Sequence, residues 1–321
     1  MTDWLKSLKF DPISPLTSSK NAIIAYFTQR DLLEEKVEPI ETIWKLSTPM
    51  KIVKKQQSDG SWKYPSKIHP HTNYSLLETF RNLGWLVEKY GFNKKHPAIE
   101  KAIEYLFSSQ TDEGDFRGIY GNQYSPNYTS AILSLVIRAG YETDPRVEKC
   151  FRWLLSNRQD DGGWAIPMRT RGVKIFDEVY ANPAPFKPVT SKPSSHWVTG
   201  IVLRAFAAHS IYRNSKETRI AGKLLESRLF LPDKYPDRRS IDHWEKFSFP
   251  FWWTDLLSAL DSLSWIGFRS DEPQIKKALE WFIAKQDSSG RWNLKLLMTG
   301  TDKDLNLWLC FAICRVFKRF F

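Results

Sequence analysis

A repeated helix-and-turn unit is the sequence feature that most constrains the fold of this chain. Three stretches open at a proline, carry a lysine four residues later and end thirteen residues after the proline: 97–110, 145–158 and 273–286. A glycine and then an aromatic residue follow each stretch, as at Gly114 and Phe116. The same ending occurs without the proline at residues 56–62. Such self-similarity is typical of an architecture built from repeated supersecondary units.

Each repeated stretch has the pattern of a helix with one charged face. Its proline lies in the first helical turn, where no amide donor is missed. The glycine allows a tight turn at the C-terminal end. The residue that ends the helix, a glutamine in most copies, can contact the aromatic ring and bond to backbone groups left at the helix end. We therefore interpret the ending as a structural clamp between neighbouring helices.

Helices that are apolar on nearly every side are predicted between the charged ones. They are expected at 72–89, 127–139, 196–210, 252–266 and 304–318, with further helices from Ser19, over 40–56 with a kink at Pro49, and over 216–229. No stretch is a convincing strand. Charged helices belong outside and apolar helices inside, so an open solenoid or a closed double ring fits. The apolar inner helices favour the closed ring, because an open concave face would be wet.

The ending Gln-x-x-Asp-Gly-x-Trp resembles the glutamine–tryptophan repeat of squalene and oxidosqualene cyclases, whose architecture the protein prenyltransferase β subunits share. Residues 56–62 match in full, and residues 286–292 have serine for aspartate. The other two copies have Phe116 for tryptophan and Arg158 for glutamine. The resemblance covers roughly residues 40–321. It implies an all-α fold, the α/α toroid, with inner and outer helices around a central apolar cavity, and it implies a polyprenyl ligand.

Three parts of the chain are expected. Residues 1–18 are proline-rich and are predicted to be an irregular extension, and residues 19–321 are predicted to form a single α/α toroid domain. Within that domain a long, basic, proline-rich loop spans 165–195 and carries Arg169 and Arg171. Loops of this length are often lids or binding segments, and the alternative is a surface excursion that covers a helix end.

Composition narrows the classes of partner. Aromatic residues make up 14% of the 321 residues, with 14 Trp and 20 Phe, so the rings must pack together or line a cavity. The net charge of +11 suits an anionic partner such as a phosphate-bearing ligand or a membrane surface, or else a solvated basic surface. No nucleic-acid-binding motif is present, and we predict no nucleic-acid partner.

The three cysteines and the first residues indicate a cellular location. Cys150, Cys310 and Cys314 are odd in number and lack a disulfide spacing, which predicts free thiols in a reducing compartment. The sequence Met1–Lys6 has no apolar signal-peptide core. We expect a cytoplasmic protein, with peripheral membrane contact as an open alternative.

The starts of the inner helices are where chemistry is expected, since converging helix N-termini attract anions. The squalene cyclase family protonates its substrate with an Asp-x-Asp-Asp motif, which this chain lacks. Asp255 is the one acid at the corresponding starts, and an N-terminal cap is the alternative to a catalytic acid. His196 is the second catalytic candidate, as acid, base or diphosphate contact, with a structural histidine as its alternative.

A metal site is not expected. Prenyltransferases bind zinc through an Asp-x-Cys pair and a histidine, and the corresponding helix starts here carry neither the cysteine nor the histidine. Cys310 and Cys314 lie one turn apart in an apolar helix and are interpreted as packing residues. We predict no metal and no cofactor.

These observations lead to two hypotheses. In the first, an isoprenoid or similar lipid binds in a central apolar cavity and is cyclised or transferred. Its predicted contacts are Tyr128, Trp197, Trp252, Trp253, Trp308, Arg169 and Arg171. In the second, the chain is a non-catalytic scaffold or lipid-binding protein that kept the toroid and lost the signature sites. The missing acid motif and zinc ligands leave both open.

Overall fold

The computed structural model describes residues 3–66, 72–173, 184–297 and 302–321. It divides into two compact units, which are described separately: unit 1 comprises Met1–Pro39 and Gly222–Phe321, and unit 2 comprises Ile40–Ala221. In the described ranges the chain is helical, and β-pairing is limited to isolated bridges. The prediction of a single domain over 19–321 stays a prediction.

Unit 2 alternates charged and apolar helices, as the sequence predicts. It contains α3 (Glu41–Trp44), α4 (Ser47–Val53), α5 (Tyr74–Gly84), η3 (Trp85–Lys89), α6 (Pro97–Phe107), α7 (Pro126–Val136), η4 (Ile137–Tyr141), α8 (Pro145–Ser156), α9 (Pro167–Thr170), α11 (His196–Ala208) and η5 (Tyr212–Asn214). The apolar helices α7 and α11 pack closely against each other. Every residue of α11 except its last is buried, which is why its sequence shows no polar face.

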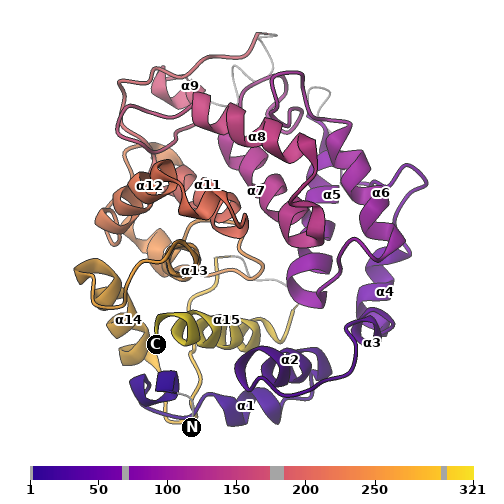
Figure 1. Ribbon diagram of the computed structural model, residues 1–321, viewed down its shortest axis with the longest axis vertical. Coiled ribbons are helices and arrows are strands. Elements are labelled where there is room, and N and C mark those ends of the chain that lie inside the picture. The colour runs from indigo at the N-terminus through magenta and orange to yellow at the C-terminus, as the bar shows by residue number, and fades with distance from the viewer. Residues whose placement is uncertain (1–2, 67–71, 174–183, 298–301) are drawn as a thin grey trace. The chain divides into compact units, whose positions relative to one another are not determined.

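Unit 1 joins the two ends of the chain. Its elements are η1 (Asp3–Ser7), α1 (Ile13–Thr17), α2 (Ala22–Phe27), η2 (Thr28–Leu32), η6 (Pro236–Arg238), η7 (Ile241–Glu245), α13 (Leu256–Ile266), α14 (Pro273–Lys285) and α15 (Leu305–Phe320). The boundary between the units falls within α12 (Lys216–Ser227). The C-terminal helix α15 contacts η1, α1, α2, η2 and α13 (Figure 1). The N-terminal residues thus form part of the core of this unit.

Three expectations about element boundaries are wrong, each for a local reason. Residues 1–18 are not irregular, because they contain η1, which buries Trp4, and α1, whose first amide, that of Ile13, donates to the Asp11 carboxylate at 2.8 Å. The helix expected over 40–56 breaks before Ser47, which places Pro49 in the first turn of α4. The helix expected from residue 252 begins at Leu256, after the N-cap Asp255.

The clamps have a repeated geometry, seen most completely at Gln56 and Gln110. The Nε2 of Gln56 donates to the carbonyl of Gly60 at 3.0 Å and to that of Ala98, the second residue of the next charged helix, at 2.8 Å. Gln110 repeats both bonds, to Gly114 at 3.1 Å and to Arg146 at 2.9 Å. These two clamps therefore fasten the end of one charged helix to the first turn of the next, which agrees with the structural interpretation of the motif.

The aromatic residue of each clamp is held at its backbone and, where it is tryptophan, at its ring. The indole N–H donates to the carbonyl ten residues earlier: Trp62 to Ile52 at 2.8 Å, Trp164 to Leu154 at 2.7 Å and Trp292 to Phe282 at 2.7 Å. The backbone N–H donates to the next apolar helix, at the hydroxyl of Thr79, Thr129 or Thr199 and at the Sγ of Cys310. The clamps thus link each charged helix to an apolar helix as well.

Candidate functional site at the starts of the apolar helices

The starts of the apolar helices are capped by their own polar residues. Asn73 accepts from the Leu76 amide at 2.9 Å, and Ser195 accepts from the Val198 amide at 3.2 Å. Ser125 caps α7 in the same way. Side-chain oxygens therefore satisfy amides that would otherwise attract an anion. An anion-attracting rim at these starts stays a prediction.

Asp255 has the structural role that the sequence left as its alternative. Its side chain is fully buried, and its Oδ1 accepts from the Ser258 amide at 2.8 Å. The Ser258 hydroxyl accepts in turn from the Asp255 amide at 2.9 Å, which completes a capping box. The other acid of this helix, Asp261, is paired with Arg319. Both carboxylates of the segment thus take part in structural bonds.

His196 and Trp197 form the first turn of α11 and are both buried, 6% and 4% exposed. They lie in unit 2 with Tyr128, which is in the first turn of α7, the helix against which α11 packs. The three candidates therefore lie on two helices that pack against each other.

Aromatic rings pack together at the starts of α7 and α5. In α7 the Tyr128 ring lies edge-on to Tyr120 at a centroid distance of 5.2 Å and to Phe80 at 6.1 Å. At the start of α5, Tyr74 packs against Tyr64 at 4.7 Å, and the Arg81 guanidinium lies 5.8 Å from the Tyr64 ring. Burial raises the pKa of the Tyr128 phenol. We call the residues Tyr64, Tyr74, Phe80, Tyr120 and Tyr128 the tyrosine cluster.

The tyrosine cluster combines packing with partial exposure. Phe80 is buried, whereas all four tyrosines keep part of their surface exposed. The sequence analysis names Tyr128 as a candidate contact but not Tyr64, Tyr74 or Tyr120. Tyr74 lies at a predicted helix start and could have been found there, whereas Tyr64 and Tyr120 lie in loops without periodicity.

The predicted tryptophan contacts of unit 1 are in two different surroundings. Trp308 is 2% exposed and stacks on Phe249 at 5.5 Å with an interplanar angle of 12°. Trp252 and Trp253 are partly exposed and precede α13. The prediction that they lie in this helix is therefore wrong. The Arg238 guanidinium lies 4.4 Å from the Trp253 ring. Trp308 is thus a packing residue, while Trp253 presents a ring that already holds a cation.

The described parts of the long loop are held by polar side chains of unit 2. Gln123 donates to the Ala184 carbonyl at 3.0 Å, and Gln159 donates to the carbonyls of Val189 at 2.8 Å and Lys192 at 2.9 Å. Arg171 donates to the Lys187 carbonyl at 2.9 Å, and Arg169 to that of Val173 at 3.3 Å. Both arginines therefore bond within the loop. Residues 174–183 of this loop lie outside the described residues.

The cysteines are buried thiols. Burial raises the pKa of Cys150 to about 12 and that of Cys310 to about 11, and it raises the pKa of Cys314 as well. Cys150 accepts from Gln110 at 3.1 Å, so two of the three thiols are clamp partners. In the described ranges, no group of three or more His, Cys, Asp or Glu residues is placed to hold a metal ion.

Together these features define an all-α protein built from repeated helix pairs. Residues 78–174 match the family model of the squalene-hopene cyclase C-terminal domain. The chain is 30% identical over 124 residues to a probable squalene–hopene cyclase of Sinorhizobium fredii, which covers 34% of this chain and 19% of that protein. It is 23% identical over 235 residues to a squalene–hopene cyclase of Bradyrhizobium diazoefficiens, covering 63% and 32%. The predicted resemblance to this superfamily is confirmed.

The matches cover only part of the related cyclases. The chain spans less than a third of the length of these cyclases. Among solved structures, a polysaccharide lyase aligns with a TM-score of 0.50 at 14% identity, covering 98% of this chain and 90% of that one. This likeness concerns the fold alone, and with the alternating helices it confirms the fold class, all-α of the α/α toroid type. The type II terpene cyclase MstE from Scytonema aligns at 11% identity with a TM-score of 0.35, covering 87% and 97%.

No described helix is both long enough and apolar enough to cross a bilayer.

Proposed function

We propose that this protein binds an isoprenoid or similar apolar lipid and that the tyrosine cluster contacts it. The observation that carries the proposal is the group of partly exposed tyrosine rings at the starts of α5 and α7. Three of the cluster residues, Phe80, Tyr120 and Tyr128, fall within the residues that match the squalene-hopene cyclase model. Aromatic faces suit an alkene chain because they offer rigid apolar surface and a negative face.

Binding without cyclisation agrees best with the acids of the described residues. Protonating an alkene requires a strong acid in a dry site, and Asp255 is engaged in a capping box. Cyclisation or transfer with Asp255 and His196 as acid and base is therefore the second proposal, supported by the family match and by the burial of both side chains. The non-catalytic scaffold is the third reading. Cytoplasmic location and peripheral membrane contact stay predictions, the latter supported by the net charge of +11.

The binding proposal is tested by equilibrium binding of radiolabelled squalene and geranylgeraniol to the purified protein. We expect Tyr128→Ala to weaken binding by about tenfold, because a buried aromatic contact contributes on the order of 1–2 kcal/mol. Tyr26→Ala is the matched control, since Tyr26 lies in unit 1 and its hydroxyl donates to the Glu38 carbonyl at 2.8 Å. Absence of binding to both lipids, or equal binding by both variants, would refute the role of the cluster.

Catalysis is tested in the same preparation by mass spectrometry of the recovered lipids. A cyclised or transferred product that disappears in Asp255→Asn, with the circular dichroism spectrum unchanged, would establish the enzyme. Bound lipid recovered unchanged from the wild type would favour the binding protein. Recovery of no lipid at all would favour the hypothesis of a non-catalytic scaffold protein.

A further inference from the structure

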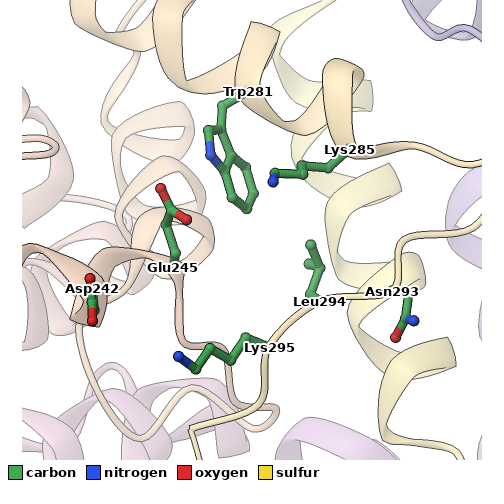
Figure 2. Close-up of a pocket in the computed structure, with 7 residues that line it drawn as sticks. All are labelled: Asp242, Glu245, Trp281, Lys285, Asn293, Leu294 and Lys295. Atoms are coloured by element: carbon green, nitrogen blue, oxygen red, sulfur yellow. The ribbon is translucent and has the colours of Figure 1, made fainter.

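A pocket lies within unit 1, and none of its lining residues belongs to the tyrosine cluster. It has a volume of about 300 Å³ and is formed by η7, the C-terminal half of α14 and the segment that follows the last clamp. Its lining includes Asp242, Glu245, Trp281, Lys285, Leu294 and Lys295 (Figure 2). This volume is at the lower end of the range for small-molecule sites, ~300–1,000 Å³.

The pocket arises where one repeat departs from the pattern. The stretch after α12 lacks the glycine–tryptophan ending, and it supplies η7 instead. Backbone bonds fix this stretch to the segment after the last clamp: the Phe247 amide donates to the Lys295 carbonyl at 2.9 Å, and the Leu297 amide donates to the Phe247 carbonyl at 2.8 Å. The Phe247 ring packs against Trp281 at 5.8 Å. The walls are therefore held together by the backbone and by aromatic packing.

Charges of opposite sign enter the pocket from different elements. The carboxylates Asp242 and Glu245 come from η7, while Lys285 comes from α14 and Lys295 from the segment after the clamp. Figure 2 shows Glu245 and Lys285 on opposite sides of the Trp281 ring. Among the described residues none of these four side chains forms an ion pair, and Lys285 Nζ instead lies 5.5 Å from the centre of the Trp281 ring. Two negative and two positive groups thus border one space without neutralising each other.

Apolar surface completes the lining. Trp281 is partly exposed and its indole points into the space, and Leu294 borders it from the segment after the clamp (Figure 2). A ligand that carries an ammonium, an anionic group and an apolar body would meet all three kinds of surface. A bare inorganic ion would leave the indole and one pair of charges without a contact.

We propose that this pocket binds a free α-amino acid with an apolar or aromatic side chain. The ammonium group would bind Asp242 and Glu245, the carboxylate would bind Lys285 and Lys295, and the side chain would lie against Trp281 and Leu294. A phosphorylated amine offers the same two charges but has almost no apolar body, so the indole and Leu294 favour the amino acid. The site is independent of the lipid proposed above.

The test is isothermal titration calorimetry of the 321-residue chain with L-phenylalanine, phenethylamine, 3-phenylpropionate and phosphoethanolamine. We expect L-phenylalanine to bind at least about tenfold more tightly than either singly charged analogue, because each analogue lacks one charge-assisted set of hydrogen bonds. Phosphoethanolamine is expected to bind more weakly than L-phenylalanine. Equal affinities for L-phenylalanine and either singly charged analogue, or no binding, would overturn the proposal, and tighter binding of phosphoethanolamine would overturn the amino-acid assignment.

Substitutions locate the site. Glu245→Gln and Lys295→Gln are each expected to weaken L-phenylalanine binding about tenfold. The matched controls are Glu280→Gln and Lys276→Gln, which are exposed positions of α14 outside the lining. Binding that falls equally in the control variants, or that survives in both pocket variants, would contradict this location. Circular dichroism of all four variants separates loss of binding from loss of fold.

Discussion

The clamps at Gln110 and Gln286 use the same atoms to hold different partners. In unit 2, Gln110 Nε2 bonds to its own Gly114 carbonyl and to the carbonyl of Arg146, in the first turn of α8. In unit 1, Gln286 Nε2 bonds to its own Gly290 carbonyl at 3.3 Å and to the carbonyl of Phe10 at 2.9 Å. Phe10 precedes α1 and is not part of a helix. The N-terminal segment therefore takes the place of the next charged helix.

The difference shows that the clamp recognises backbone rather than a particular side chain. A Cβ on Gly114 would lie 2.4 Å from the Lys149 carbonyl oxygen, and a Cβ on Gly290 would lie 1.9 Å from that of Asp11. Both glycines thus lie against the backbone of their partner. A helix and a segment outside any helix can each present a carbonyl at this place, so one motif serves both junctions.

The largest effect is expected for Gly114→Ala. The substitution places a methyl group against backbone and forces a φ of +110° on alanine, so we expect a loss of about 4 kcal/mol in the free energy of unfolding. Gly267→Ala is the control, because it shares a positive φ of +85° but meets nothing within 4 Å. It should lose only about 1–2 kcal/mol. Urea denaturation measures both, and equal losses would show that the contact with Lys149 has no role.

Gln286→Ala is expected to act on the N-terminal segment. Gln286 is buried, and its Oε1 also accepts from the amides of Lys9 at 3.0 Å and Phe10 at 3.1 Å. Removing the side chain leaves several backbone groups without partners, at about 2–3 kcal/mol. Hydrogen exchange of residues 9–12 should accelerate strongly. The matched variant Gln110→Ala should leave this segment protected, and acceleration in both variants would contradict a local role.

The sequence predicted the repeat better than it predicted what the last copy binds. The helix pairs and the clamp role follow from local spacing, because proline, glycine and the apolar pattern act within one turn. The partner of Gln286 lies 276 residues away and is recognised through its backbone, so no side-chain pattern marks it. Asp255 was placed correctly as a cap candidate, whereas the residues just before it were assigned to the helix that the cap actually begins.

The site was predicted least well where the repeat degenerates. Tyr128 lies in a helix with a clear pattern and is a predicted contact, and this stays a prediction. Tyr120 lies in the preceding loop, which has no such pattern. Asp242 and Glu245 lie in a stretch without helical periodicity, and they meet Trp281 only through long-range packing. Periodicity in the sequence predicts the helices that repeat. It does not predict contacts between residues in a stretch where the repeat is interrupted.

Trp292→Phe is expected to have a smaller effect than either clamp variant above. Phenylalanine keeps most of the ring packing and loses the indole bond to the Phe282 carbonyl, which should lower stability by about 1–2 kcal/mol. Phe116 shows that a clamp can form without this bond, since its amide still donates to Thr129 at 3.2 Å. Trp164→Phe should lose a similar amount in thermal unfolding. A loss in either variant as large as that of Gly114→Ala would mean that the ring, not the turn, determines the clamp.

The smallest expected effect is on the pH dependence of stability, and it arises from ion pairs at the Gln110 junction. Arg146, whose carbonyl Gln110 holds, donates to Asp144 and Glu104 at 2.7 Å each, and these bonds lower the pKa of both carboxyls. A lowered pKa stabilises the fold above the ordinary value and loses that contribution as the pH falls below about 4.

Arg146→Gln should therefore destabilise the protein at pH 7 and make almost no difference at pH 2. The expected loss at pH 7 is about 1 kcal/mol or less, because Glu104 is 57% exposed and solvent screens its interaction. Arg152→Gln, an exposed position of the same helix, is the control. In urea denaturation at both pH values, a loss for Arg146→Gln that is the same at pH 2 as at pH 7 would assign its role to packing rather than to charge, and would leave the two junctions alike in depending on backbone contacts alone.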